Sequence, residues 1–153
     1  MKHPNWNSLV TEFGRSIGLE EMSLGDTGLC RVELDEVTAI DFETDGDGRL
    51  HLYCILPKVP EDQRPVLHTA MLEANYTNHR ALAPVCFAID PANGEEILHF
   101  MLPGDVDLLP ETFSTLVSDF SALAHAWCLK CRDFRNGAPS AHSTPASNPV
   151  SYA

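Results

Sequence analysis

Apolar residues recur along the first part of the chain with two different spacings, and each spacing predicts one kind of element. In residues 6–17 they return every three or four positions, as on one face of a helix. Gly18 follows at the place where a left-handed residue would end that helix. Residues 29–34, 37–43 and 50–56 instead alternate between apolar and polar, which is typical of half-buried strands. The helical face consists of Trp6, Leu9, Val10, Phe13 and Ile17.

The second half of the chain predicts a helix, two strands and a last helix. Asp62 suits the N-cap of the middle helix, and Asn75 suits its end. Strands are predicted at 85–89 and 97–102. A long apolar face at helical spacing then begins after Pro110, a residue suited to a first helical turn. The apolar face of the middle helix consists of Leu67, Ala70, Met71 and Ala74.

Glycine-containing turns join the strands in two places. Residues 45–48 lie between the second and third strands and residues 90–94 between the last two, and glycine supplies the positive φ that hairpin turns need. The element order therefore predicts an α+β fold, with three helices and an antiparallel sheet of about five strands. We expect one domain in residues 1–135. Residues 136–153, rich in Ala, Ser and Pro, are predicted to be a disordered tail.

The charge balance narrows the classes of partner. The chain holds 22 acidic against 10 basic residues, a formal net charge of −12. Nucleic acids and anionic membrane surfaces attract clustered Lys and Arg, and the sequence has no such cluster. It also has no apolar run long enough for a membrane span. We expect no nucleic acid and no membrane insertion, and an acidic chain of this kind suits a basic or aggregation-prone protein partner.

Cysteine usage and the N-terminus indicate a reducing compartment. The five cysteines have irregular spacing, which fits free thiols better than a disulfide framework. Residues 1–6 have no apolar core of the kind that a signal peptide needs. Both features predict a cytoplasmic protein.

The sequence offers two weak candidates for thiol or metal chemistry. Cys128 and Cys131 form a C-x-x-C pair, which a thiol oxidoreductase would use. They fall late in the last predicted helix, where the helix dipole disfavours a thiolate. His125 stands three residues before Cys128, but a structural zinc needs a fourth ligand that the sequence does not supply. We expect both cysteines to be structural.

No other motif predicts catalysis or a bound ion. Asp41, Glu43 and Asp45 resemble the start of a calcium loop, but Leu52 stands where that loop needs a bidentate carboxylate. The sequence has no Gly-x-Ser-x-Gly, no phosphate loop and no His-Glu-x-x-His. We therefore expect no catalytic residues, no metal, no cofactor and no enzyme activity.

One face of the predicted sheet is more apolar than a solvated face should be. Tyr53, Ile55, Ile97 and Met101 point away from the expected core. We expect this face to be covered by a helix, a second subunit or a bound segment. Protein binding is thereby favoured over catalysis.

Several short segments stand out because they occur together and in a fixed order. They are residues 9–14, 17–19, 28–30 with Asp35, 71–75 and 86–90, and then Phe113, Phe120 and Trp127. Together they resemble the class I type III secretion chaperones, the Tir-chaperone (CesT-like) family. The resemblance extends over roughly residues 5–133 in register and element order.

This resemblance implies a homodimeric cytoplasmic chaperone of a Gram-negative bacterium, with a role in virulence. Such a chaperone binds the N-terminal region of a secreted effector in extended form and keeps it soluble and export-competent. It passes the effector to the secretion ATPase and uses no ATP itself. The resemblance also implies that the first helix and the sheet hold the effector, and that the middle helix contributes to the dimer interface.

Element position and periodicity give the residue predictions. The expected effector-binding residues are Leu9, Phe13, Ile17, Val32, Leu34, Ile40 and Phe42. The expected dimer interface is Leu67, Ala70, Met71 and Ala74. Two other functions stay open: a cytoplasmic protein-binding or regulatory module of the same fold outside secretion, and a thiol oxidoreductase that uses Cys128 and Cys131.

Overall fold

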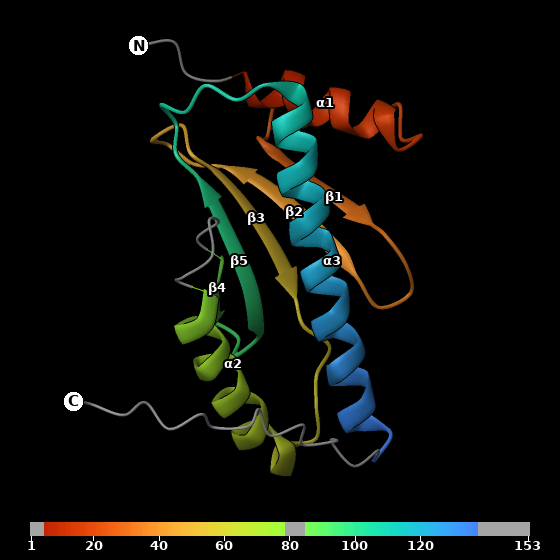
Figure 1. Cartoon of the computed structure of the whole chain (residues 1–153), viewed down its shortest axis with the longest axis vertical. Helices are drawn as coiled ribbons and strands as arrows, with labels where there is room; N and C mark the ends of the chain where they lie inside the picture. The colour runs from red at the N-terminus through yellow and green to blue at the C-terminus, as the bar shows by residue number, and fades with distance from the viewer. Residues whose placement is uncertain (1–4, 79–84, 138–153) are drawn as a thin grey trace, which may run out of the picture.

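The computed structural model of the chain describes residues 5–78 and 85–137 (Figure 1). Its elements follow the predicted order, with an additional 3₁₀ turn at Glu61–Gln63. The helices and strands are α1 (Trp6–Ser16), β1 (Leu29–Glu33), β2 (Ala39–Thr44), β3 (Leu50–Ile55), α2 (Arg64–Asn78), β4 (Val85–Ile89), β5 (Glu96–Leu102) and α3 (Pro110–Arg135).

The strands form an antiparallel sheet in the order β1-β2-β3-β5-β4. Leu52 of β3 pairs with Phe42 of β2 and with Phe100 of β5. Because β5 lies between β3 and β4, the two edge strands are β1 and β4. The predicted α+β fold, with three helices and a five-stranded antiparallel sheet, is confirmed.

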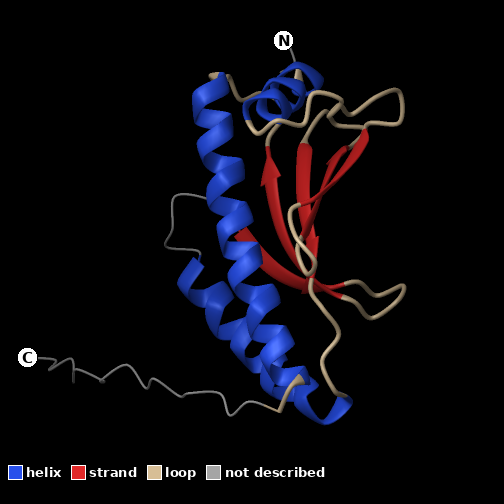
Figure 2. Ribbon diagram, turned by 90° about the vertical axis from the view of Figure 1, so that its right-hand side faces the viewer, coloured by secondary structure: helices blue, strands red, loops and turns tan. Residues whose placement is uncertain are grey.

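The helices lie on one face of the sheet and leave the other face uncovered (Figure 2). Successive strand residues point to opposite faces, and the core takes every second one. Ile40 and Phe42, for example, are each 1 % exposed. α1 and α3 meet at Phe113, whose ring centroid lies 6.4 Å from those of Trp6 and Phe13. The hydrophobic core therefore fills the space between the sheet and α1 and α3.

Three predicted turns occur where glycine was expected. Gly18 has a φ of 82° directly after α1, which ends the helix as predicted. Gly48 and Gly94 both have a φ of 75° in the loops that join β2 to β3 and β4 to β5. A side chain at such φ values is strained, so these positions favour glycine.

Both predicted ends of the middle helix are wrong. Asp62 lies within the 3₁₀ turn and α2 begins at Arg64, so Asp62 is not its N-cap. Asn75 does not end α2, because the helix continues to Asn78. The Asn75 amide instead bonds to the backbone of Phe87 in β4. A long-range contact has replaced the local capping role that the sequence suggested.

The last helix ends at Arg135, with Asn136 as its C-cap residue. Of the tail predicted at 136–153, residues 138–153 lie outside the described residues. Within the two described ranges, no helix is both long enough and apolar enough to span a membrane.

Candidate functional site

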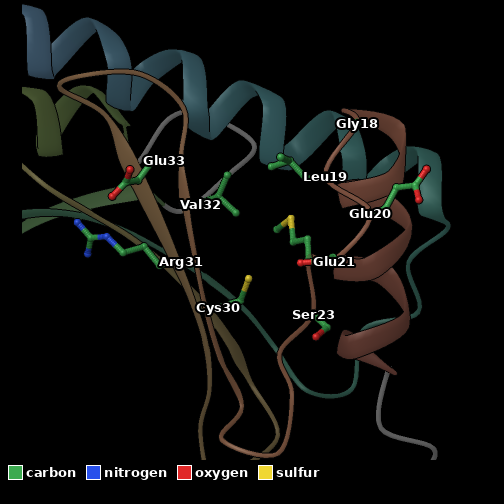
Figure 3. A pocket seen from close by; sticks show the side chains of 10 residues that line it. Gly18, Leu19, Glu20, Glu21, Ser23, Cys30, Arg31, Val32 and Glu33 are labelled. Carbon is green, nitrogen blue, oxygen red and sulfur yellow. The ribbon is translucent and has the colours of Figure 1, made fainter.

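A groove lies between the turn that follows α1 and the free edge of β1. Its volume is about 630 Å³, and residues 18–23 and 30–33 line it. The side chains of Leu19 and Val32 point into the groove from its two walls, whereas Arg31 points away (Figure 3). We call this feature the β1 groove.

The end of α1 positions the first wall of the groove. The N–H of Leu19 donates to the C=O of Gly14 at 2.8 Å, which folds the chain back against the helix. Gly14 permits this close packing, because a Cβ there would lie 2.5 Å from the Cβ of Met22. Met22 is buried, whereas Leu19 is 42 % exposed. Leu19 is therefore the accessible apolar residue of this wall.

The second wall is β1, and its outward backbone groups are available for pairing. The C=O of Gly28 accepts a hydrogen bond from the N–H of Thr44, and the N–H of Leu34 donates to the C=O of Thr38. Hydrogen-bonded pairs alternate with non-bonded pairs along an antiparallel ladder. Between Gly28 and Leu34, the even-numbered residues Cys30 and Val32 therefore bond to β2. The N–H and C=O of the odd-numbered residues point outward, and no hydrogen bond joins them to another described segment. These residues are Leu29, Arg31 and Glu33.

Three acidic residues line this groove, Glu20, Glu21 and Glu33, and the stretch of chain that contains them is acidic. Ten of the 22 acidic residues lie in residues 20–47, where the only Lys or Arg is Arg31. Arg31 forms an ion pair with Asp41 at 3.0 Å, so its charge is compensated. Glu20 and Glu33 line the groove and are exposed. The groove therefore combines an apolar interior with an acidic rim.

The seven predicted effector-binding residues have different environments. Ile17 and Leu34 are 44 % and 41 % exposed, and each adjoins a stretch of chain that lines the groove. Val32 lines the groove itself but is 5 % exposed. Effector binding by these residues stays a prediction. Val32 is also a member of the core, and the remaining four belong to the core or pack against it: Leu9, Phe13, Ile40 and Phe42.

Sequence patterning missed Leu19, Met22 and Cys30, which also line the groove. Leu19 and Met22 follow the glycine that ends α1 and fit neither a helical nor a strand period. Apolar residues directly after a helix stop were the available signal. Nothing local marks β1 as an edge strand, because strand order depends on long-range pairing.

The predicted dimer face of α2 points largely toward the chain's own sheet. Leu67 and Met71 are 0 % and 4 % exposed, and Ala70 and Ala74 are half-buried. A different side of α2 is open to a partner. Its large exposed apolar residues are Val66, Leu72 and Tyr76.

The uncovered face of the sheet carries the apolar residues that were predicted to need a cover. Tyr53, Ile55 and Ile97 line a hollow of about 720 Å³ there. The described helices all lie on the other face (Figure 2), so a helix of the described chain is excluded as the cover. Beside this hollow, Nδ1 of His51 lies 2.9 Å from Nε2 of His99. Burial, together with the neighbouring His51, lowers the pKa of His99.

The C-x-x-C pair is not an accessible redox site. Cys128 and Cys131 are both 0 % exposed. Burial raises the pKa of Cys131 to about 12, whereas a catalytic thiol needs an accessible thiolate. Within the part of the chain that the structure describes, no group of three or more His, Cys, Asp or Glu is arranged to hold a metal ion.

The fold and the groove define an α+β domain with an apolar, acid-rimmed groove beside an unpaired strand. Residues 8–128 match the Tir chaperone protein (CesT) family, and the chain belongs to this family. No curated protein sequence matches the chain.

Solved structures share the fold at low sequence identity. A structure of the HopA1–SchA chaperone–effector complex is 18 % identical with a TM-score of 0.65, covering 81 % of this chain and 93 % of that chain. The ExoU–SpcU complex from the type III secretion system of Pseudomonas aeruginosa is 18 % identical with a TM-score of 0.58, covering 80 % and 94 %. YbjN from E. coli, which is not described as a chaperone, is 11 % identical with a TM-score of 0.57, covering 82 % and 90 %. The fold by itself therefore does not define the function.

Proposed function

We propose that the chain is a cytoplasmic type III secretion chaperone whose β1 groove binds the N-terminal chaperone-binding region of an effector. The observation that carries this proposal is an unpaired strand edge beside an apolar groove. Membership of the Tir chaperone family supports an effector as the partner, as do a similar structure of a chaperone–effector complex and one of a heterodimeric complex from a type III secretion system. Delivery of the effector to the secretion ATPase belongs to the same proposal.

An extended effector segment fits this site as an added strand. Its backbone would pair with the outward N–H and C=O groups of Arg31 and Glu33. Every second side chain of the added strand would then enter the groove between Leu19 and Val32, because strand residues alternate between faces. The acidic rim favours basic or neutral residues at the positions between, through an attraction that salt weakens.

Position at the groove, together with exposure, divides the predicted residues into two roles. Phe13, Ile40 and Phe42 are at most 7 % exposed and support the walls from within the core. Contact with the effector falls to the groove residues and to the exposed residues next to them. These residues are Ile17, Leu19, Val32 and Leu34.

Two matched substitutions test the surface. Leu19 and Ile55 are similarly exposed, at 42 % and 38 %, but lie at the groove and on the uncovered sheet face respectively. We expect Leu19→Asp to weaken binding of an N-terminal effector fragment at least tenfold, about 1.4 kcal/mol, and Ile55→Asp to change it less than twofold. Isothermal titration calorimetry with an N-terminal fragment of an effector that co-purifies with the chain from its native host measures both.

If Ile55→Asp weakened effector binding more than Leu19→Asp did, the binding site would lie on the uncovered sheet face instead. No binding of the unsubstituted chain to that fragment, or to any effector co-purified from the native host, would contradict the chaperone function. In that case a protein-binding module outside secretion would account better for the fold.

We also propose that the chain is a homodimer that pairs through the outer side of α2. Leu67 and Met71 hold this helix on the sheet from beneath, while Val66 and Leu72 are exposed apolar residues on its outer side. A standard interface buries on the order of 1,600 Å² in total.

Light scattering at micromolar concentration tests the dimer. We expect the mass of two chains for the unsubstituted protein and for the control Glu73→Ala. Leu72→Asp places a charge on this outer side of α2 and should give the mass of one chain. A monomer mass without any substitution would contradict the proposal.

A further inference from the structure

Two buried thiols face each other between the sheet and the last helix. The Sγ of Cys54 in β3 lies 3.6 Å from the Sγ of Cys128 in α3, and both residues are 0 % exposed. They stand 74 positions apart in the chain. The contact therefore joins two elements, β3 and α3, that are far apart in the chain and not cross-linked.

A polar path leads from the surface to this pair. Nδ1 of His125 lies 2.8 Å from the Asp35 carboxylate and 3.1 Å from Oγ1 of Thr38. Thr38 is 1 % exposed and is a hydrogen-bond partner of Cys128. If Nδ1–H donates to Asp35, the Thr38 hydroxyl is left to donate to the Cys128 sulfur. The buried hydroxyl thus connects a surface His–Asp pair with a core thiol.

The environment distinguishes Cys128 from the other buried thiols. Hydrogen bonds from Cys54 and Thr38 lower the pKa of Cys128 against the opposing effect of burial. The pKa of Cys54 is raised by its hydrogen bond with Cys128 and by burial, and the pKa of Cys131 is raised by burial. The dipole of α3 adds little, because Cys128 lies seven residues before the helix end at Arg135 and the effect fades beyond the last turn. We therefore assign the first reaction step to Cys128.

We propose that Cys54 and Cys128 form a reversible intramolecular disulfide in the presence of hydroperoxides, which fastens α3 to β3. The Cys128 thiolate attacks the peroxide oxygen, the O–O bond breaks, and a sulfenic acid and hydroxide form. The Cys54 thiol then attacks the sulfenic sulfur, an S–S bond forms, and water leaves with the Cys54 proton. In sum, two thiols and one hydrogen peroxide give one disulfide and two waters.

Burial decides how this reaction proceeds. Peroxide reaches the sulfurs only when the contact between α3 and the sheet opens locally. The oxidation rate should therefore reach a plateau as the peroxide concentration rises. The disulfide forms inside the core, so Cys54 and Cys128 react with each other and not with thiols of other molecules. This inference does not depend on effector binding.

The test treats the full chain, carrying Cys30→Ser and Cys86→Ser, with hydrogen peroxide under native conditions. These substitutions remove the two thiols that are not buried. We expect two thiols to disappear, a mass lower by two hydrogen atoms, and a cross-linked peptide pair containing Cys54 and Cys128. The melting temperature should rise by roughly 10 °C, because a long loop is closed, and a dithiol reductant should reverse it.

Matched variants separate the pair from its neighbour. Cys131→Ala should still form the cross-link, whereas Cys54→Ala should not. The proposal is wrong if the peptide map joins Cys131 to either partner, if the pair stays reduced, or if it reacts only in denaturant. The peptide map of the oxidised chain that keeps Cys54, Cys128 and Cys131 tests the proposal even if a variant with a core substitution fails to fold.

Discussion

The two edges of the sheet are finished in opposite ways. At β4, Asn75 of α2 accepts a hydrogen bond from the N–H of Phe87 at 2.7 Å and donates to its C=O at 3.1 Å. At β1, the outward groups of Arg31 and Glu33 have no such partner among the described residues. An unpaired edge is a template for another strand. The chain thus caps the middle of the β4 edge itself, at Phe87, and leaves the outward groups of β1 to a partner.

Buried charge strengthens the closed side. Glu96 of β5 is 3 % exposed and accepts hydrogen bonds from Arg64 at 2.9 Å and from His68 at 2.8 Å. Burial alone would raise the pKa of Glu96, but the hydrogen bonds from His68 and Arg64 outweigh it and lower that pKa. The first turns of α2 are therefore fixed to the sheet, whereas the turn after α1 stands apart from β1 across the groove.

The largest effect is expected where the closed side is held by charge. Glu96→Ala leaves Arg64 without its buried partner, and we expect the free energy of unfolding to fall by about 3 kcal/mol. Urea titration measures this. Glu95→Ala is the control, since the described contacts of the Glu95 side chain are with Asn93 of its own loop, and it should cost less than about 1 kcal/mol. Equal losses would show that the buried ion pair is not what holds α2.

The next effect concerns the edge itself. Asn75→Ala leaves the N–H and C=O of Phe87 unpaired, so we expect a loss of about 2 kcal/mol in the free energy of unfolding. Thr77→Ala, a change at an exposed position two residues later on the same helix, is the control and should cost well under 1 kcal/mol. If Asn75→Ala were as mild as its control, water would replace the amide without cost and the β4 edge would not be closed by Asn75.

A smaller effect should appear at the open edge. Glu33→Pro removes an N–H that points away from β2, so β1 stays paired while one donor for an added strand is lost. We expect the affinity for the effector fragment to fall about tenfold, about 1.4 kcal/mol. Glu33→Ala removes the same side chain but keeps the N–H. A matching loss in this control would mean that the side chain, not the backbone edge, binds the effector.

The smallest effect is a pH dependence on the uncovered face. The folded-state pKa of His99 is lowered, so the unfolded chain binds the proton more readily. Stability should therefore fall as pH drops below about 6.5, the ordinary histidine value, toward the folded-state pKa. His99→Gln should show a weaker fall over this range and no change of slope near pH 8. Parallel curves for the two proteins between pH 8 and 5 would contradict this.

Much of the fold could be predicted because its signals are local. The period of α1, the alternation in β2 and β3 and the glycine after α1 each act within a few residues. The site was harder to predict. Ile17 and Leu34 adjoin the groove, whereas Phe13, Ile40 and Phe42 share the same patterns and are core. Periodicity shows which face of an element is apolar, not whether another part of the chain already covers it.

The sequence by itself determined the elements, their order and the α+β class, because spacing and turn chemistry select them locally. Tertiary structure alone decided that β5 inserts between β3 and β4, which makes β1 an edge strand. It also decided that Asn75 caps Phe87 on the opposite edge, although its local preference was to end a helix. Both outcomes depend on contacts between residues far apart in the chain, where the free energy of pairing and burial outweighs local preference.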